Sequence, residues 1–528
     1  MCLSAGVRAW NLWVVPSPTD ELEGVRRGLA IARGEILPLT DFEPYIGALW
    51  NYLLALGFLI SGPSEYVARG VTLMVGVATV PATYLLAREL GGRGVAAIAA
   101  LLLACSSAHA LAASHPAWSH SMAPLFLTLG LWQVARCIRL TSGPALLAAG
   151  AALGLALQIH LTMLAALPGI GLALLLSRWR WITTGWFYLA ALLGLCLIAN
   201  IIAFNVATGF ESVRRAGTVQ AAYARAKGPT DGLILDNARR MGVSALRSIS
   251  GAVDIRPTPF DYTTDPLTLA AAALSASGLL LLTLRGQLLP LFAVSSYIGL
   301  LLLFNAKYEV IPNSRFLTPL LPLAFTCTAI ALGAGVSPLR KSGVLRSVLI
   351  SVVALTLAGF SLLGLARRMD QMSYSSRVTQ EIHQSIDFVE ARLDQAPMVL
   401  LDRNLDRLWL DGGGEMYMAL GWELYRRNIP YADLPYRVVP RTGDTDPCRR
   451  QWLIATLVDR SNDFPRWIRS ALGQNPHVLP QRFWTFRVTP QEPRPGNLDE
   501  NEHVVLAYQP PLNGSSRTVD RCSPGRMI

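Results

Sequence analysis

Charged residues are scarce in this sequence. Only 15% of its 528 residues are Asp, Glu, Lys or Arg, whereas 52% are hydrophobic. In soluble domains about a quarter of the residues are charged. The shortage excludes an ordinary soluble domain for most of the chain and predicts an integral membrane protein.

Cysteines at metal-binding spacing are also absent. The seven cysteines form no Cys-x-x-Cys pair and no Cys/His cluster, so no metal site is predicted. Five are interpreted as small buried hydrophobic residues: Cys2, Cys105, Cys137, Cys196 and Cys327. Cys448 and Cys522 lie in the polar C-terminal part, where a disulfide would form if that part faces an oxidising compartment.

Three further signals are missing. The net charge of +11 is not gathered on one basic face or arm, so no nucleic-acid partner is predicted. Residues 412–414, three glycines, are not followed by the Lys-Ser/Thr of a phosphate-binding loop and indicate a turn. Residues 1–13 contain no basic region followed by a long apolar stretch, so no signal peptide is predicted.

Apolar segments dominate the chain from residue 68 to residue 366. A membrane span needs about 20 apolar residues, and on that basis we predict about ten spans, at 68–91, 93–113, 119–137, 142–160, 161–178, 183–205, 266–284, 287–304, 314–335 and 345–366. The shorter apolar segment at 45–60 predicts an interfacial or half-inserted helix.

The charge distribution divides the chain into three parts. Residues 1–67 form a first external segment with acidic residues, 68–366 the transmembrane bundle with an external loop at 206–265, and 367–528 a polar part. The fold class predicted is a polytopic α-helical membrane protein with a C-terminal mixed α/β domain.

The α/β prediction for the last part depends on hydrophobic spacing. Apolar residues recur at intervals of three and four between 378 and 393, which predicts an amphipathic helix. Short strands are predicted at 398–402, 452–459 and 504–509.

Basic residues in the short connections indicate the orientation. Cytoplasmic loops are enriched in Lys and Arg. One side of the predicted bundle carries a single acid, Glu89, against many basic residues: Arg88, Arg93, Arg136, Arg139, Arg178, Arg180, Arg285, Arg340, Lys341 and Arg346. This side is predicted to be cytoplasmic, which places every polar cluster and the C-terminal domain on the extracytoplasmic face of the cytoplasmic membrane.

The 206–265 loop is basic although it falls on the extracytoplasmic side. Its basic residues are Arg214, Arg215, Arg225, Lys227, Arg239, Arg240, Arg247 and Arg256. Either these residues bind an anionic lipid headgroup, or the loop contains a solvated amphipathic helix.

Acidic residues precede the bundle. Asp20 and Glu21 are followed by Glu23, Glu35, Asp41 and Glu43. Carboxylates beside a membrane bundle are costly unless they face water or a polar cavity, and a carboxylate can act as the general base that deprotonates an acceptor hydroxyl. The alternative is helix capping by Thr19 or Asp20, with Glu23 in the first turn.

The order of motifs in this part of the chain resembles the GT-C superfamily. The residues are Asp20-Glu21, then 34–38 (GEILP), 43–56 (EPYIGALWNYLLAL), 62–64 (GPS) and a span ending at 84–88 (YLLAR). Within GT-C, the sequence is similar to polyprenyl-phosphate-sugar-dependent enzymes of the protein O-mannosyltransferase and aminoarabinose transferase type. The resemblance covers roughly residues 8–365 and implies that Asp20 activates the acceptor, with Glu21 orienting the site or binding substrate.

The sequence departs from this family at two places. The family has a span before its acidic pair, whereas here only residues 8–12 resemble the end of one, which would be explained by a truncated or misassigned start. The turn at 114–120 (SHPAWSH) lacks the acid that similar proteins often carry there, which argues against a two-carboxylate or metal-bridged site.

Further candidate binding residues lie near the same predicted face. His115, His120 and His160 are candidates for binding a phosphate or a sugar hydroxyl, or else are ordinary interfacial residues. Lys307 and Arg315 precede a Leu/Pro-rich span that resembles the family segment holding the lipid phosphate, although Arg315 could instead extend to the interface at a span end.

Glu43 and Tyr45, from the first motif, complete the predicted binding set. No metal and no cofactor is predicted.

The predicted function is a membrane glycosyltransferase of the cell envelope. It would move a monosaccharide from a polyprenyl-phosphate donor to a lipid, glycan or protein acceptor. Two other functions are a transporter or flippase of a lipid-linked sugar and a non-catalytic envelope scaffold. Transporters typically show repeated halves and ionisable residues near the midplane, and this sequence shows neither feature.

Overall fold

The computed structural model describes residues 1–12, 19–227, 233–251, 265–304, 314–335, 342–391, 398–402, 409–410, 414–429, 431–434, 452–458, 482–487 and 503–508. The chain forms two compact units. The first comprises Met1–Leu12 with Glu23–Gln371, and the second comprises Trp13–Leu22 with Met372–Ile528.

The first unit is helical. Its helices are α1 (Cys2–Ala9), α2 (Thr19–Ala32, which starts in the other unit), α3 (Leu49–Ser61), α4 (Glu65–Gly91), α5 (Arg93–Ala104), α6 (Ser107–Ala113), η2 (Ser119–Met122), α7 (Ala123–Leu140), α8 (Gly143–Ile159), η3 (Leu161–Ala166), α9 (Leu167–Arg178), η4 (Trp179–Thr183), α10 (Gly185–Leu197), α11 (Ala199–Thr208), α12 (Glu211–Lys227), α13 (Leu233–Ser250), α14 (Pro266–Leu284), α15 (Leu289–Phe304), η5 (Ser314–Phe316), η6 (Thr318–Leu320), α16 (Leu321–Gly335) and the first part of α17 (Gly343–Glu390).

Six helical segments of the described chain are long and apolar enough to cross a membrane, or up to eight if each of two bent pairs is one span. The predicted class of polytopic helical membrane protein is therefore confirmed. A helix or bent helix pair stands at each predicted span, but α8 and α15 are shorter than the length such a crossing needs. The count of ten spans stays a prediction.

Two predicted spans are bent. The axes of α5 and α6 differ by 57°, and those of α10 and α11 differ by 59°. Both breaks interrupt apolar sequence that contains no proline at the bend, which is why hydropathy predicted each pair as one straight helix.

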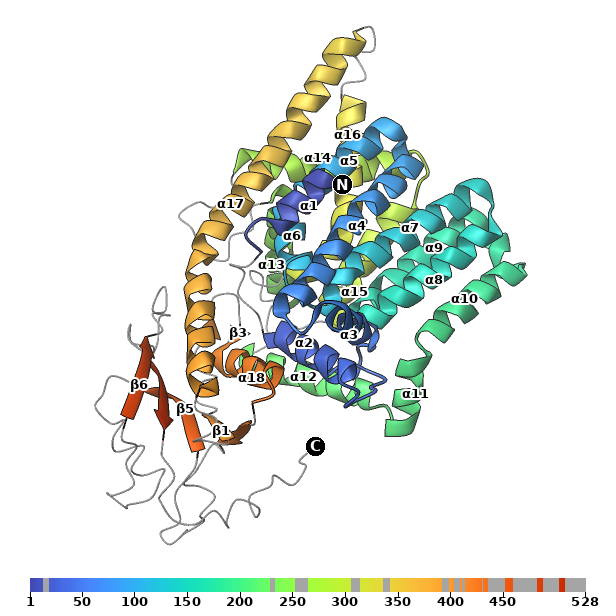
Figure 1. Ribbon diagram of the computed structural model, residues 1–528. Helices are drawn as coiled ribbons and strands as arrows, with labels where there is room; N and C mark the ends of the chain where they lie inside the picture. The colour runs from blue at the N-terminus through green and yellow to red at the C-terminus, as the bar shows by residue number, and fades with distance from the viewer. Residues whose placement is uncertain are drawn as a thin grey trace. The chain divides into compact units, whose positions relative to one another are not determined.

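Small residues allow the helices of the bundle to approach closely. An added Cβ on Gly150 would lie 2.3 Å from the Ala190 carbonyl oxygen, and one on Gly154 would lie 2.9 Å from Gly194 Cα. The backbones of α8 and α10 are therefore in direct contact, as is usual where small residues line membrane helix interfaces. Figure 1 shows α7, α8 and α9 side by side in this part of the bundle.

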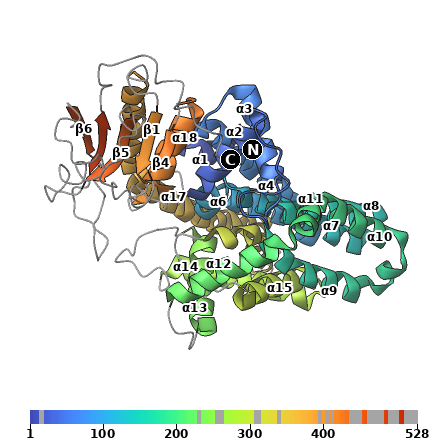
Figure 2. The ribbon, with the colours of Figure 1, turned by 90° about the horizontal axis from the view of Figure 1, so that it is seen from below.

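The external loop contains two helices, α12 and α13. α13 lies against α14 and α15 (Figure 2). Its buried residues recur at helical spacing, at Asn237, Met241, Ser244 and Ser248, while Arg239 and Arg240 are exposed. α13 is therefore amphipathic: one face packs on the bundle, and Arg239 and Arg240 lie on the exposed face.

Three of the five membrane-part cysteines are buried, namely Cys105, Cys137 and Cys327. The prediction of burial is wrong for Cys2 and Cys196, which are exposed. Cys196 lies on α10, where Ala190 is the buried residue, so most of that helix faces outward. The predicted pair Cys448 and Cys522 lies outside the described residues.

The second unit contains the end of α17, α18 (Met416–Arg426) and a five-stranded mixed sheet of order β4-β1-β5-β7-β6. The strands are β1 (Met398–Asp402), β4 (Tyr431–Leu434), β5 (Trp452–Val458), β6 (Arg482–Arg487) and β7 (His503–Tyr508), and β2 (Trp409–Leu410) pairs with β3 (Gly414–Glu415). β1 is parallel to β4 and β5, whereas β7 is antiparallel to β5 and β6. A separate extracytoplasmic α/β domain stays a prediction.

Ion pairs link the two helices of the second unit. Arg427, just after α18, lies 2.6 Å from Asp387 and 2.7 Å from Glu390 on α17. Burial alone would raise the pKa of the Glu423 carboxyl, but hydrogen bonds from His383 and Arg426 lower it to about 2. This network fixes α18 on α17.

Candidate active site

Three turns of the first unit meet around His120. His120 lies in η2, and its ring centroid is 5.1 Å from that of His160 and 5.4 Å from that of Phe316. The rings of His160 and Phe316 are 5.9 Å apart. His160 separates α8 from η3, and Phe316 ends η5. Turns that are far apart in the sequence therefore form one aromatic cluster.

The first external segment reaches the same cluster through Tyr45. The Tyr45 ring centroid lies 5.9 Å from that of His160, edge to face. Gly47, two residues later, donates its N–H to the carbonyl oxygen of Gln158 at 2.8 Å. The segment that carries the sequence motif is thus fixed beside the end of α8.

Arg315 lies between two aromatic rings of the cluster. Its guanidinium carbon is 4.7 Å from the centroid of the Trp118 ring and 5.1 Å from that of Phe316. Both distances suit a cation–π contact, which is stronger where water is excluded. The side chain is half-buried. The aromatic rings therefore hold the plane of the guanidinium group in place.

The two histidines of the cluster differ in hydrogen bonding. The N–H of Thr162 donates to His160 Nδ1 at 3.2 Å, so this nitrogen carries no proton. His120 is 3% exposed, and neither of its ring nitrogens has a hydrogen-bond partner among the described residues. Buried polar atoms are nearly always hydrogen-bonded in folded proteins, so His120 is the side chain of the cluster most suited to a ligand.

Polar side chains hold the turns of the cluster in position. Trp50 Nε1 donates to the carbonyl oxygen of Ala117 at 2.9 Å, and the Tyr297 hydroxyl donates to that of Phe316 at 2.8 Å. These bonds connect α3 and α15 to the turns that carry His120 and Arg315.

The amide of Gln158 forms a second anchor. Its Nε2 donates to the Leu197 carbonyl oxygen at the bend between α10 and α11, and also to Asn200. Asn200 Nδ2 in turn donates to the Leu39 carbonyl oxygen of the first external segment at 2.6 Å. The side-chain partner of Gln158 is therefore Asn200.

Asp41 is a buried carboxyl group beside the cluster segment. It is 4% exposed, and its Oδ1 accepts from the Phe42 N–H at 2.8 Å and from Asn51 Nδ2 at 3.1 Å. Burial raises the pKa of this carboxyl to about 6, although both hydrogen bonds and the charge of Arg27 act in the opposite direction. The sequence placed Asp41 in an acidic segment, but no signal in it distinguished this acid from the others.

The remaining predicted residues are not all in the cluster. Glu43 forms an ion pair with Arg215 of α12, with Nε 3.3 Å from Oε2. His115 is fully buried and lies near Arg69 and Arg8; burial and then the charge of Arg69 lower its pKa to about 3. His115 is therefore neutral at ordinary pH.

The predicted catalytic pair begins α2. Glu21 is fully buried in the first turn of this helix. The side chain of Asp20 and all of Lys307 lie outside the described residues. Among the residues that are described, no three His, Cys, Asp or Glu side chains are placed to share a metal ion, and a metal-independent site stays a prediction.

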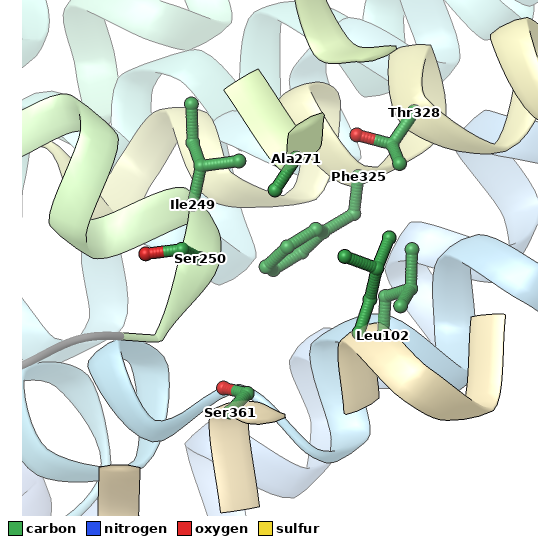
Figure 3. Close-up of a pocket in the computed structure, with 8 residues that line it drawn as sticks. Leu102, Ile249, Ser250, Ala271, Phe325, Thr328 and Ser361 are labelled. Carbon is green, nitrogen blue, oxygen red and sulfur yellow. The ribbon is translucent and has the colours of Figure 1, made fainter. Parts of the chain in front are cut away.

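A pocket of about 300 Å³, including its open mouth, lies elsewhere in the bundle, between α5, α13, α14, α16 and α17. Its polar groups are the hydroxyls of Ser250, Thr328 and Ser361, and Leu102 and Phe325 supply much of the apolar wall (Figure 3). The ends of α13 and α5 thus meet α17 at this pocket.

The comparison with known proteins agrees with the sequence resemblance. Residues 47–204 match the sequence model of the family described as dolichyl-phosphate-mannose-protein mannosyltransferase. The crystal structure of ArnT from Cupriavidus metallidurans bound to undecaprenyl phosphate is similar with a TM-score of 0.53 and 13% identity, over 96% of this chain and 96% of ArnT. The chain has the GT-C fold.

Other solved structures extend this comparison. ArnT from the same organism in the apo state gives a TM-score of 0.50 at 14% identity, over 94% of this chain and 95% of ArnT. The Archaeoglobus fulgidus oligosaccharyltransferase, in complex with Zn and sulfate, gives a TM-score of 0.49 at 15% identity, over 84% of this chain. This chain spans 62% of that protein. No curated protein matches the sequence closely enough to count as a relative. The predicted resemblance to the GT-C superfamily is confirmed.

Proposed function

We propose that this GT-C protein transfers a monosaccharide from a polyprenyl-phosphate donor to an acceptor on the extracytoplasmic face of the cytoplasmic membrane. The observation that carries the proposal is the meeting of Tyr45, His120, His160 and Arg315 in one cluster. All four belong to the binding set predicted from the sequence. ArnT, whose fold this chain shares, has been crystallised with undecaprenyl phosphate, which supports a lipid phosphate as the ligand.

Arg315 would bind the phosphate of the donor. The planar guanidinium can donate two parallel hydrogen bonds to phosphate oxygens, and Trp118 and Phe316 restrict its rotation. Charge accumulates on the phosphate as its bond to the sugar breaks. A preorganised cation at that position stabilises the transition state more than the bound donor. Lys307, from the same loop of the sequence, would assist.

The neighbouring rings would bind the sugar and the phosphate. Both nitrogens of His120 are available for hydrogen bonds, and Tyr45 and His160 offer polar edges beside it. His115 and Glu43 would act indirectly, since His115 lies beside Arg8 and Arg69 and Glu43 is paired with Arg215.

Asp20 would act as the general base. It would take the proton from the acceptor hydroxyl while that oxygen forms a bond to the anomeric carbon. The bond between this carbon and the phosphate oxygen breaks, its electron pair leaves with the polyprenyl phosphate, and the anomeric configuration inverts. Glu21, in the same helical turn, would orient the site. No metal or cofactor takes part in this scheme.

The membrane arrangement is part of the proposal. The ten predicted spans correspond to the six long helices, the two bent pairs, α8 and α15. The exposed arginines at the ends of α4, α7 and α9 would face the cytoplasm, following the positive-inside bias. The His120 cluster and the C-terminal α/β domain would then lie outside.

Incubation of the purified protein with radiolabelled polyprenyl-phosphate sugars tests the proposal. Sugar transfer with release of the lipid phosphate is expected, and Asp20→Asn should abolish transfer while donor binding is retained. A flippase would instead move the labelled lipid across a vesicle membrane without releasing phosphate, and a scaffold would do neither. If transfer is unchanged in Asp20→Asn, the assignment of the base is wrong.

A further inference from the structure

The break between α5 and α6 is stabilised from both sides by side chains of other segments. In a continuous helix the N–H of Ser107 would donate to the Leu103 carbonyl oxygen. Here it donates to Ser361 Oγ of α17 at 3.0 Å, and Ser107 Oγ donates to the Gly251 carbonyl oxygen at 2.6 Å. Figure 3 shows Ser361 beside the pocket. A break at membrane depth requires such replacement partners.

Arg8 supplies the partners on the opposite side of the break. This side chain is fully buried. Its terminal nitrogens donate to the carbonyl oxygens of Leu103 at 3.1 Å and Ala104 at 3.0 Å, the last residues of α5. A cation at a helix C-terminus is favoured by the helix dipole. Arg8 therefore compensates the carbonyl groups that the break exposes.

The same guanidinium group also holds the far end of α6. Arg8 Nε donates to Ser114 Oγ at 3.2 Å, one residue after α6 ends, and Nη2 lies 2.9 Å from His109 Nδ1. Ser114 Oγ donates in turn to the His109 carbonyl oxygen at 3.0 Å. One side chain thus contacts the residues before, within and after α6.

The turn that follows α6 carries the centre of the candidate active site. Ser114 leads into Trp118, which stacks on Arg315, and into His120, which contacts His160. We propose that Arg8 is the positioning residue for this 114–120 turn. The catalytic consequence of the proposal rests on the proposed function, whereas the structural consequence does not.

The acceptors of Arg8 explain why arginine is needed. Within the described residues the Arg8 side chain is hydrogen-bonded to neutral groups: two helix carbonyl oxygens, His109, Ser114, and the carbonyl and hydroxyl oxygens of Ser4. A lysine has three donors on one atom, whereas the guanidinium fork spreads five over a plane. Lysine can therefore bond the α5 carbonyls or Ser114, but not both at once.

Hydrogen exchange on the full chain in detergent tests the positioning directly. In Arg8→Lys and Arg8→Met, amides from 105 to 122 should exchange at least about tenfold faster than in the wild type, because local opening sets exchange there. Leu146→Ala is the matched control. Leu146 is buried in a core cluster near the start of α8, whereas His160 of the candidate site follows the end of that helix. Leu146→Ala should therefore have a lower melting temperature than the wild type and unchanged exchange at 105–122.

Kinetics give the catalytic consequence. A displacement of about 1 Å at a reacting group can cost about 100-fold in rate. Transfer by Arg8→Lys should therefore fall about 10- to 100-fold in kcat/KM, while Leu146→Ala retains the wild-type value per folded molecule. If Arg8→Met does not fold, Arg8→Lys and Ser114→Ala, which removes one acceptor, supply the same comparison.

The outcomes separate the two proposals. Wild-type exchange at 105–122 in both Arg8 variants would overturn the positioning role, whatever the activity. Faster exchange in a protein whose wild type transfers no sugar would support the positioning role and contradict the proposed function. Faster exchange with unchanged kcat/KM would overturn the link between the turn and catalysis.

Discussion

The two ends of the helix bundle use ionisable residues in opposite ways. At the end where α4, α7 and α9 finish, basic side chains are exposed, among them Arg136, Arg139 and Arg178. Arg139 pairs there with Glu89, and its side chain is 58% exposed. At the end where these helices begin, Arg69, Asp41 and His120 are at most 4% exposed.

The two ends differ in how far their ionisable side chains are exposed to solvent, and not in the types of residue that they contain. An exposed ion pair contributes little free energy, because water screens it and its side chains lose freedom on pairing. A buried polar group must be hydrogen-bonded or it costs free energy. Changes at the exposed end should therefore be nearly silent, and changes at the buried end should be large.

Of three substitutions that test this comparison, Arg315→Ala is expected to have the largest effect. Loss of a preorganised group that stabilises transition-state charge costs about 100- to 1,000-fold in rate, or about 3 to 4 kcal/mol. The matched control at the exposed end is Arg139→Ala, which should change the stability by about 0.5 kcal/mol at most and leave transfer intact. The measurement is kcat/KM for the polyprenyl-phosphate sugar. Equal losses in both variants would remove the distinction between the two ends.

A slightly smaller effect is expected for Asp41→Asn, and it depends on pH. The pKa of Asp41 is raised to about 6 in the folded protein, above its ordinary value near 4. A raised carboxyl pKa favours folding below about pH 4 and loses that contribution as the pH rises through about 6. A shift of about two units corresponds to about 3 kcal/mol.

Thermal unfolding at pH 5 and pH 8 measures this effect. The asparagine retains an oxygen that can accept from Phe42 and Asn51, so Asp41→Asn should be more stable than the wild type at pH 8, with a smaller difference at pH 5. Asp265→Ala is a useful control, because it removes the side chain that caps α14 and should lower the stability by about 1 kcal/mol at both pH values. A difference in stability between the two proteins that is larger at pH 5 than at pH 8 would contradict the sign.

The smallest of the three effects is expected for Gly47→Ala. An added Cβ would lie 1.7 Å from Gln158 Oε1 and 2.9 Å from the Gln158 carbonyl oxygen. The first external segment would have to move away from α8, at a cost of about 1 to 3 kcal/mol. Gly171→Ala, on α9, has nothing within 4 Å of the added atom and should not lower the melting temperature. A melting temperature unchanged by Gly47→Ala would mean that the segment is not held by Gln158.

Much of the helical architecture was predictable from hydropathy. Helices α4, α14 and α16 lie where the apolar segments predicted spans, because a helix satisfies its own backbone in an apolar environment. The bends at Cys105 and Ile198 were not predictable. They depend on Arg8 and Gln158, which are distant in sequence from the bends that they stabilise.

The candidate site was predicted as a set of residues and not as an arrangement. Tyr45, His120, His160 and Arg315 were selected from the resemblance and from their shared predicted face, and the structure brings these four together. His115 was grouped with them because all three histidines lie near the same predicted face. The turn between them directs the two histidines to different neighbours.

Sequence by itself determined that this chain is a membrane protein, where most of its helices lie and which superfamily it resembles, since these properties depend on composition and on local order. Tertiary structure alone decided which polar residues are buried, which ring nitrogens of the histidines are hydrogen-bonded, and that an arginine at position 8 joins both ends of α6. Burial and hydrogen bonding depend on segments tens to hundreds of residues apart. No local pattern in the sequence specifies which of those segments will meet.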